Sequence, residues 1–178
     1  MKILILGGSK SGKSSTGQEL CRRLAQGPLI YWATMEPCDS EDEARIVRHI
    51  EDRDGMGFET IEKGRNIRGA QVPADSTIMF DAVTALLANE MFGKGCVDRD
   101  AGLRVMEDLA DLSGRCSNIV CVCDEIWRDG TVYDETTELY RRELALVCRK
   151  LAESFDVVGE VCCGIVKCYK GSLNEILD

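Results

Sequence analysis

The sequence of 178 residues predicts an α/β fold, with a doubly wound, mostly parallel sheet covered by helices on both faces. Short apolar runs of strand length alternate along the chain with longer amphipathic segments of helical period. No repeat, low-complexity tract or Pro/Gly/Ser linker interrupts this alternation. We therefore expect residues 1–178 to form a single domain.

The expected elements follow from where these runs occur. The apolar runs predict strands at Lys2–Leu6, Leu29–Ala33, Thr77–Phe80, Asn118–Cys123 and Val158–Cys163. The amphipathic segments predict helices at Lys13–Ala25, Ser40–Asp52, Ala82–Phe92, Asp98–Gly114 and Thr136–Phe155. The pattern between Asp54 and Ala74 is less regular, and we expect a short hairpin or a loop there.

The charge balance and the apolar runs exclude some classes of function. The formal net charge is -9, from 22 Lys and Arg against 31 Asp and Glu, whereas nonspecific nucleic-acid binding needs a basic face. The longest apolar runs, such as VTALLA, are too short to span a membrane, and MKILILGGSK does not resemble a signal peptide. We expect a cytoplasmic protein that does not bind nucleic acid.

Ten cysteines are a high count for this length. No pair has the C-x-x-C spacing of a zinc site. Several cysteines lie in the apolar segments NIVCVCDE and GEVCCGIV, where we expect small buried hydrophobic residues that stay reduced. A metal or redox role for them is the alternative.

The segment ILILGGSKSGKSS matches the phosphate-binding pattern G-x-x-x-x-G-K-[ST], with a strand predicted before it and a helix after it. Its glycines let backbone N–H groups point inward at phosphate oxygens, and the helix adds its positive N-terminal end. Lys13 can reach the β and γ phosphates, and Ser14 can ligate Mg²⁺. We therefore expect a P-loop domain that binds a nucleoside triphosphate through Gly7, Gly8, Ser9, Lys10, Ser11, Gly12, Lys13 and Ser14.

A carboxylate at the end of a nearby strand is the second element expected of a Mg²⁺ site. The apolar run STIMFD ends in Asp81, which is expected at the carboxyl edge of the sheet beside the phosphate loop. A role in holding Mg²⁺ or water is favoured because the acidic strand end occurs together with the loop. Asp124 and Glu125, which end the run NIVCVC, are a rival pair for the same role.

The stretch ARIVRHI contains His49, the single histidine of the chain. In a helix over Ser40–Asp52, Ile46 and Ile50 would form an inward stripe, and the polar face would carry Arg45, Arg48, His49 and Asp52. Spacing alone favours a solvated face. The alternative is a phosphate-handling site, because neighbouring arginines would keep the imidazole neutral and hold an anionic phosphate against it.

Together these segments resemble the bifunctional adenosylcobinamide kinase / adenosylcobinamide-phosphate guanylyltransferases of cobalamin biosynthesis. The family's G-G-x-R-S-G-K-S is here GGSKSGKS, its strand end I-A-T is YWAT, and its R-I-x-x-H is RIVRH. Its R-P-x-x-W-x-T-x-E is the slightly longer RDGMGFETIE, and its acidic strand end with T-x-x-x-x-N is DAVTALLANEMF. The segment CCGIVKCYKG loosely resembles the last strand of the family.

The resemblance implies a P-loop fold, a trimeric homo-oligomer, Mg²⁺ as cofactor, and two substrates: a nucleoside triphosphate and a cobinamide-type small molecule. The kinase activity would phosphorylate the aminopropanol hydroxyl of adenosylcobinamide with GTP or ATP. In the transferase activity, His49 would attack the α-phosphate of GTP and pass GMP to cobinamide phosphate. His49 and Lys13 would be catalytic, and Ser14 and Asp81 would hold the metal. Beyond the loop, the implied nucleotide-binding residues are Thr34, Arg45, Arg53, Glu62 and Asp81.

The second half of the chain departs from the family's motifs. T-N-E-V-G-x-G-I-V-P is here VCDEIWRDGTVYD, with Asp124 for the asparagine and Trp127 for a glycine. F-R-D-x-x-G-x-x-N-Q is here YRRELALVCR, in which Arg141 is kept. Two alternatives stay open: a P-loop small-molecule kinase without guanylyltransferase activity, and a nonenzymatic nucleotide-binding module. The acceptor and the choice between ATP and GTP in the kinase step also stay open.

Overall fold

The computed structural model describes residues 1–37, 46–47, 50–51, 53–93 and 95–177. A seven-stranded sheet with the order β3-β2-β4-β5-β1-β6-β7 runs through its centre. All neighbouring strands are parallel except β6 and β7, which are antiparallel. The strands are β1 (Lys2–Gly7), β2 (Leu29–Ala33), β3 (Glu59–Glu62), β4 (Thr77–Asp81), β5 (Asn118–Asp124), β6 (Val157–Cys162) and β7 (Ile165–Lys170).

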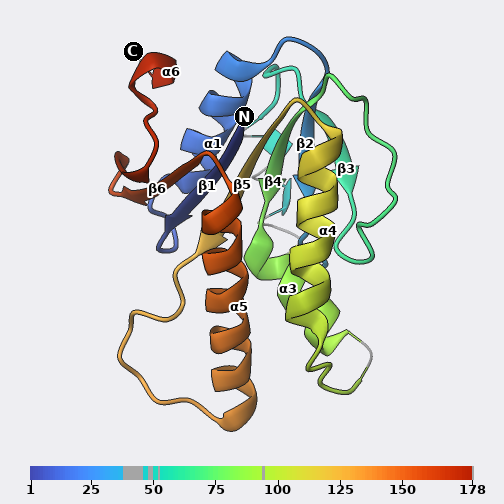
Figure 1. Cartoon of the computed structure of the whole chain (residues 1–178), viewed down its shortest axis with the longest axis vertical. Coiled ribbons are helices and arrows are strands. Elements are labelled where there is room, and N and C mark those ends of the chain that lie inside the picture. Colours follow the sequence, from blue (N-terminus) through green and yellow to red (C-terminus); the bar gives the residue numbers. More distant parts are fainter. Residues whose placement is uncertain (38–45, 48–49, 52, 94, 178) are drawn as a thin grey trace.

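Helices cover both faces of this sheet (Figure 1). The helices are α1 (Lys13–Leu24), α3 (Val83–Phe92), α4 (Ala101–Arg115), α5 (Glu135–Ser154) and the short α6 (Asn174–Leu177). Helices α3, α4 and α5 pack together on one face, and α1 packs on the other. This arrangement confirms the predicted α/β class with a doubly wound, mostly parallel sheet.

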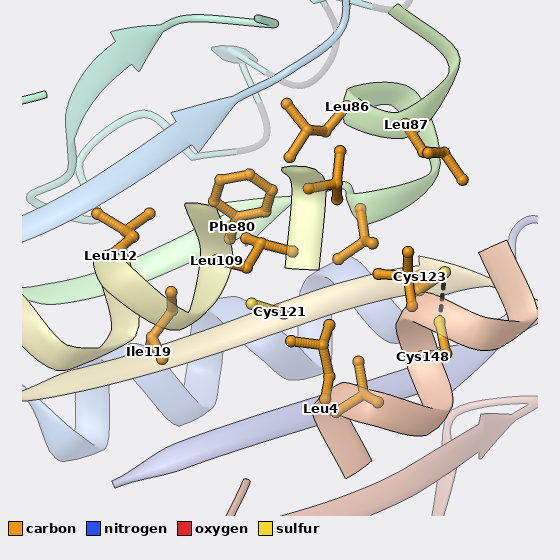
Figure 2. Packing of buried hydrophobic residues seen from close by; sticks show 14 of the residues in the cluster. Leu4, Phe80, Leu86, Leu87, Leu109, Leu112, Ile119, Cys121, Cys123 and Cys148 are labelled. Atoms are coloured by element: carbon orange, nitrogen blue, oxygen red, sulfur yellow. Dashed lines mark hydrogen bonds between the residues drawn. The ribbon is translucent and has the colours of Figure 1, made fainter. Parts of the chain in front are cut away.

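The alternation of side chains along β5 explains why its sequence is almost continuously apolar. Ile119, Cys121 and Cys123 join the core under α3, α4 and α5, whereas Val120 and Val122 join the core under α1. Figure 2 shows the first of these clusters, with the β5 residues packed among leucines of the helices. A strand buried on both faces has no polar side, so its two periodic faces are both hydrophobic.

The buried cysteines behave as the sequence predicts. Cys121 and Cys123 lie in the core, and the thiol of Cys148 on α5 lies 3.3 Å from Cys123 Sγ, at hydrogen-bonding distance (Figure 2). Burial raises the pKa of the Cys121 thiol well above its usual range, which keeps it protonated and unreactive. All cysteines in the part of the chain that the structure describes are free thiols.

The prediction for GEVCCGIV is wrong in one respect, because Cys162 and Cys163 are exposed. Strand β6 ends at Cys162, and the chain turns at Cys163 and Gly164, whose φ angles are 51° and 78°. Two consecutive residues with positive φ form the tight turn of a hairpin, which leads directly into β7. The apolar run is therefore divided between a strand and a turn.

Two regions of the chain differ from the sequence prediction in other ways. The segment expected to be a hairpin or a loop contains β3, which is a parallel edge strand beside β2 rather than part of a hairpin. Most of the expected helix over Ser40–Asp52 lies outside the described residues, with Arg45, Arg48 and His49, although residues 46–47 and 50–51 are helical. Ile50 is 46% exposed, so the predicted inward stripe is wrong at that position.

Among the described helices, none combines the length and the apolar character that crossing a lipid bilayer would demand.

Candidate nucleotide-binding site

The loop between β1 and α1 has a conformation that only glycine permits at two positions. A Cβ atom at Gly7 would lie 2.6 Å from Ser11 Oγ and 2.7 Å from the carbonyl oxygen of Val161. Gly12 immediately precedes α1 and has a φ of 98°, in the left-handed region that favours glycine. Gly8, Ser9 and Lys10 between them are exposed. Gly7 and Gly12 therefore fix the backbone turn that leads from β1 into the first turn of α1.

The turn of the β6–β7 hairpin holds this loop from the side. The N–H of Gly164 donates a 2.9 Å hydrogen bond to the carbonyl oxygen of Ser11. A Cβ at Gly12 would lie 3.4 Å from Gly164 Cα, so the two backbones are in close contact. The hydroxyl of Ser11 is buried without a hydrogen-bond partner among the residues that the structure describes. A buried hydroxyl without a hydrogen-bond partner costs free energy.

Lys13, the first residue of α1, is 9% exposed and lies between two acceptors. Its Nζ donates a 3.2 Å hydrogen bond to the carbonyl oxygen of Gly8 and forms a 2.6 Å ion pair with Asp124 Oδ1. Asp124 ends β5 directly beside Gly7 of β1. Of the carboxylates considered from the sequence, Asp124 is thus the one in direct contact with the loop lysine.

Glu125, the other member of the rival pair, is placed differently. Its backbone N–H donates to the carbonyl oxygen of Gly7 at 3.1 Å, and its side chain is 8% exposed and lies 3.3 Å from Arg128. Burial raises the pKa of the Glu125 carboxyl, and the charge of Arg128 offsets only part of this effect. Glu125 therefore supports the end of β1 through its backbone, while its side chain pairs with Arg128.

Asp81 ends β4, one strand further from the loop than Asp124. Its Oδ2 accepts a 2.6 Å hydrogen bond from the hydroxyl of Tyr31 on β2. Tyr31 and Met79 pack in the core under α1, so strand alternation places Asp81 on the same face of the sheet as α1. Both acidic strand ends thus lie at the carboxyl edge on the side of the P-loop helix, as expected for parallel strands.

Thr34 follows β2 and is fully buried. Its hydroxyl donates to the carbonyl oxygen of Ala82 at 2.8 Å and accepts from the N–H of Ala82 at 2.7 Å. The backbone N–H of Thr34 also donates to the carbonyl oxygen of Asp81 at 3.0 Å. In this structure Thr34 therefore holds the strand end that presents Asp81.

Arg53 packs on β2 and β3, and Glu62 ends β3. The guanidinium carbon of Arg53 lies 4.1 Å from the centre of the Tyr31 ring, and its Nη2 donates to Thr60 Oγ1 at 3.2 Å. Arg53 is 8% exposed, whereas Glu62, which ends β3 beside Ala33, is exposed. The structure thus gathers the predicted Arg53, Glu62 and Asp81 on neighbouring segments, while Arg45 and His49 lie outside the described residues.

The donor set at this edge fits Mg²⁺. Ser14 in the first turn of α1, Asp81 and Asp124 offer the hard oxygen ligands that this cation prefers. Within the described ranges no group of three or more His, Cys, Asp or Glu side chains could hold a metal ion. Magnesium sites of nucleotide-binding proteins commonly use one or two carboxylates together with the phosphates of a substrate.

Arg141 on α5 organises the loop that follows β5. This buried arginine donates to the carbonyl oxygens of Ile126 and Thr131 and pairs with Asp129 and Glu138 at 3.0 and 2.7 Å. Beside this loop, the exposed face of the β6–β7 hairpin lines a hollow of about 540 Å³. Arg128 of the loop pairs with Glu160 of β6 at 2.7 Å, which joins the loop to the hairpin.

Three contacts of the site have no sequence motif that would predict them. These are the hydrogen bond from Tyr31 to Asp81, the hydrogen bond from the Asp124 N–H to Thr84 Oγ1 at 2.9 Å, and the contact of Gly164 with the loop. Each joins segments that are distant in sequence. Tyr31 could be placed on the α1 face only by combining strand alternation with the strand order.

Comparison with known proteins identifies the family. A sequence model described as cobinamide kinase / cobinamide phosphate guanyltransferase matches residues 3–168. The chain belongs to this family. Among the relatives of this chain, the bifunctional adenosylcobalamin biosynthesis protein CobU of Salmonella typhimurium is 29% identical over 180 aligned positions, which cover 93% of this chain and 97% of the relative. The protein of the same name from Escherichia coli is 30% identical over 98 positions, covering 53% of this chain and 52% of the relative.

One solved structure supports the fold of this family member. A protein from Pyrococcus horikoshii OT3 matches with a TM-score of 0.51 at 11% identity, covering 98% of this chain and 88% of the other. The flagellar accessory protein FlaH from Methanocaldococcus jannaschii matches with a TM-score of 0.45 at 16% identity, covering 97% and 79%. The first likeness concerns the fold alone, whereas the family match places the chain among enzymes of cobalamin biosynthesis.

Proposed function

We propose that this cobinamide kinase / guanyltransferase family member phosphorylates adenosylcobinamide and then transfers GMP from GTP to adenosylcobinamide phosphate through a GMP–histidine intermediate. The observation that supports the proposal most is the position of Lys13. Its Nζ lies at the mouth of the loop, between the carbonyl oxygen of Gly8 and the carboxylate of Asp124. A buried lysine at the start of a helix is placed to receive phosphate oxygens.

Binding of the triphosphate would use groups of this chain that are already in position. The loop N–H groups and the N-terminus of α1 would bind phosphate oxygens, the hydroxyl of Ser11 would gain a partner, and Lys13 would neutralise charge. Ser14, Asp81 and Asp124 are the residues that would hold Mg²⁺. When bound, the cation would act as a Lewis acid and neutralise negative charge on the phosphate oxygens.

The kinase step is a displacement at the γ-phosphorus. The aminopropanol hydroxyl oxygen of adenosylcobinamide forms the new P–O bond, the bond to the β–γ bridging oxygen breaks, and the nucleoside diphosphate leaves. The hydroxyl proton passes to solvent. Lys13 and the N-terminus of α1 hold the phosphates in place and stabilise the charge that develops on the leaving group.

The transferase step is proposed to use His49 as the nucleophile. A neutral imidazole nitrogen forms a bond to the α-phosphorus of GTP, and the bond to the pyrophosphate oxygen breaks. A phosphate oxygen of adenosylcobinamide phosphate then attacks the same phosphorus, the N–P bond breaks, and the imidazole is regenerated. Arg53, four positions after His49, supports this proposal because it packs on Tyr31 at the edge that carries Asp81.

The decisive experiment is covalent labelling of the full chain with GTP in the presence of Mg²⁺. GTP labelled at the α-phosphate should leave acid-labile label on the wild type, and GTP labelled at the γ-phosphate should not. His49→Asn should abolish the label but keep GTP binding, Lys13→Ala should abolish both, and Lys150→Ala on the exposed side of α5 should change neither. A folded wild-type protein that binds GTP but takes no α-label would overturn the histidine mechanism.

The same experiment separates the alternatives. Transfer of γ-phosphate to adenosylcobinamide without α-label would identify a kinase without guanylyltransferase activity. GTP binding without label or turnover would identify a nonenzymatic module. The trimeric assembly that the family resemblance implies is part of the proposal, and sedimentation equilibrium of the purified chain measures it directly.

A further inference from the structure

We propose that Asp124 is a specificity-determining residue, because its carboxylate competes with the nucleotide phosphates for Lys13 and thereby makes triphosphate binding dependent on Mg²⁺. The inference rests on the proposed nucleotide-binding function and deepens it. The site thereby selects the magnesium complex of a nucleoside triphosphate over the metal-free anion.

The first observation is the contact itself. Lys13 Nζ and Asp124 Oδ1 are 2.6 Å apart, and the two side chains are 10% and 31% exposed. A pair of this kind is short, charge-assisted and poorly screened by solvent. Any phosphate oxygen that approaches Lys13 therefore meets a lysine whose charge is already shared with a carboxylate of the chain.

The backbone of Asp124 is held on three sides. Asp124 lies beside Gly7 in the parallel register of β1 and β5, and its N–H donates to Thr84 Oγ1 at 2.9 Å. The next N–H along the chain, that of Glu125, donates to the carbonyl oxygen of Gly7 at 3.1 Å. The carbonyl oxygen of Thr84 in turn accepts from the hydroxyl of Tyr140 at 2.9 Å. The carboxylate is short and fixed at its base, so it stays at the mouth of the loop.

A triphosphate in the loop places several negative charges near the Asp124 carboxylate, and like charges in a half-buried setting repel strongly. Without a metal ion, Asp124 thus opposes binding in two ways, by repelling the phosphates and by retaining Lys13. A divalent cation reverses the first effect, since it is attracted to carboxylate and phosphate together, and it leaves Lys13 available for the phosphates.

The experiment measures GTP affinity of the full chain by calorimetry, once in excess EDTA and once in saturating Mg²⁺. Asp124→Asn keeps the size of the side chain and removes its charge. We expect it to tighten metal-free GTP binding about tenfold, which corresponds to about 1.4 kcal/mol, and to reduce the enhancement by Mg²⁺ by at least the same factor. Asp75→Asn removes the same charge at the exposed amino end of β4 and should leave both affinities unchanged.

The outcomes separate this inference from the function on which it rests. A folded wild type that binds no GTP in Mg²⁺ overturns both. If the wild type binds GTP but Asp124→Asn leaves metal-free affinity unchanged or weaker, only the competition is overturned, and a loss confined to the Mg²⁺ condition makes Asp124 a metal ligand alone. Asp124→Ser, a second neutral variant, replaces Asp124→Asn if circular dichroism shows that the latter does not fold.

Discussion

The hydroxyl of Tyr31 donates a 2.6 Å hydrogen bond to Oδ2 of Asp81 across the boundary between β2 and β4. Tyr31 is 3% exposed, and the guanidinium of Arg53 lies 4.1 Å from the centre of its ring. The ring of Phe58 meets the same ring edge-on, with centroids 5.9 Å apart. One buried side chain thus connects the acidic end of β4 to the arginine that follows the histidine stretch.

The hydroxyl of Tyr31 is predicted to set the metal dependence of nucleotide binding. Tyr31→Phe keeps the ring under Arg53 but removes the hydrogen bond that orients the Asp81 carboxylate. Hydrogen bonds to charged groups contribute about 1.5–3 kcal/mol, so the Mg²⁺ concentration for half-maximal GTP binding should rise about tenfold or more. A Mg²⁺ titration at fixed GTP measures this shift.

Tyr169→Phe is the matched control, because that hydroxyl donates to Glu160 Oε2 on the exposed β6–β7 hairpin. It should leave the Mg²⁺ midpoint unchanged. Equal midpoints for the two variants and the wild type would mean that Tyr31 has a structural role only.

Replacement of Gly7 by alanine should destabilise the protein much more than replacement of Gly8, although the two residues are neighbours. In Gly7→Ala the new Cβ would lie 2.7 Å from the backbone oxygen of Val161, so the end of β1 must shift. Overpacking of this kind costs about 1–3 kcal/mol, and GTP binding should fall with the displaced loop. In Gly8→Ala the Cβ meets nothing within 4 Å, so the free energy of unfolding should change by less than about 0.5 kcal/mol. Urea denaturation of both variants tests the contrast, and equal losses would contradict it.

Glu125 should make stability fall as pH rises above the ordinary carboxyl range. Burial raises its pKa above the ordinary value of 4.5, so the folded chain binds more protons than the unfolded chain between 4.5 and the raised pKa. Within that window Glu125 lowers stability as pH increases. Glu125→Gln removes this titration, so its free energy of unfolding should rise relative to wild type from pH 4.5 upward. Urea denaturation across this pH range measures the difference.

The control for this pH dependence is Val132→Ala, because Val132 is 89% exposed and carries no titrating group. Its difference from wild type should stay constant across the same pH range. A constant difference for Glu125→Gln as well would show that the raised pKa of Glu125 has no influence on folding.

Arg141 and Arg142 are adjacent on α5, but only replacement of Arg141 should lower the free energy of unfolding and loosen the loop after β5. Arg141 is 9% exposed and holds Ile126, Asp129 and Thr131 of the loop after β5, whereas Arg142 is exposed. Arg141→Met should cost about 2–4 kcal/mol of unfolding free energy, less than a fully buried pair because its carboxylate partners are partly solvated. It should also speed proteolysis within residues 126–134, as fragment masses would show. Arg142→Met should do neither, and similar behaviour of the two variants would refute the role of Arg141.

The sequence predicts β1, β4 and β5 well because each is buried on both faces, and continuous burial leaves a local apolar run. It does not predict β3, which is a short edge strand whose residues are mostly exposed. It also does not predict β7, because the exposed face of this strand carries Ile165 as well as Lys167, so the sequence lacks a clear alternation of apolar and polar residues. A strand on the edge of a sheet has a solvent side whose composition is weakly constrained.

The phosphate loop is likewise readable from sequence, since its glycines, lysine and flanking elements are contiguous. The sequence does not show whether Asp81 or Asp124 pairs with Lys13. Both end parallel strands, and only the strand order decides that β5 lies between β1 and β4 and brings Asp124 to the lysine. The hydrogen bond from Tyr31 to Asp81 depends on the same strand order. The residue types show which carboxylates could pair with Lys13, and the strand order determines which one does.

The hydrogen bond from the Gly164 N–H to the Ser11 carbonyl oxygen bears on the order in which the site is completed during synthesis. The phosphate loop is encoded within the first 14 residues, but both strands that flank β1 and the turn that holds the loop come from the second half of the chain. A nascent chain that has left the ribosome only as far as α4 carries the whole motif without its supports. The phosphate loop is therefore synthesised well before the segments that hold it in place.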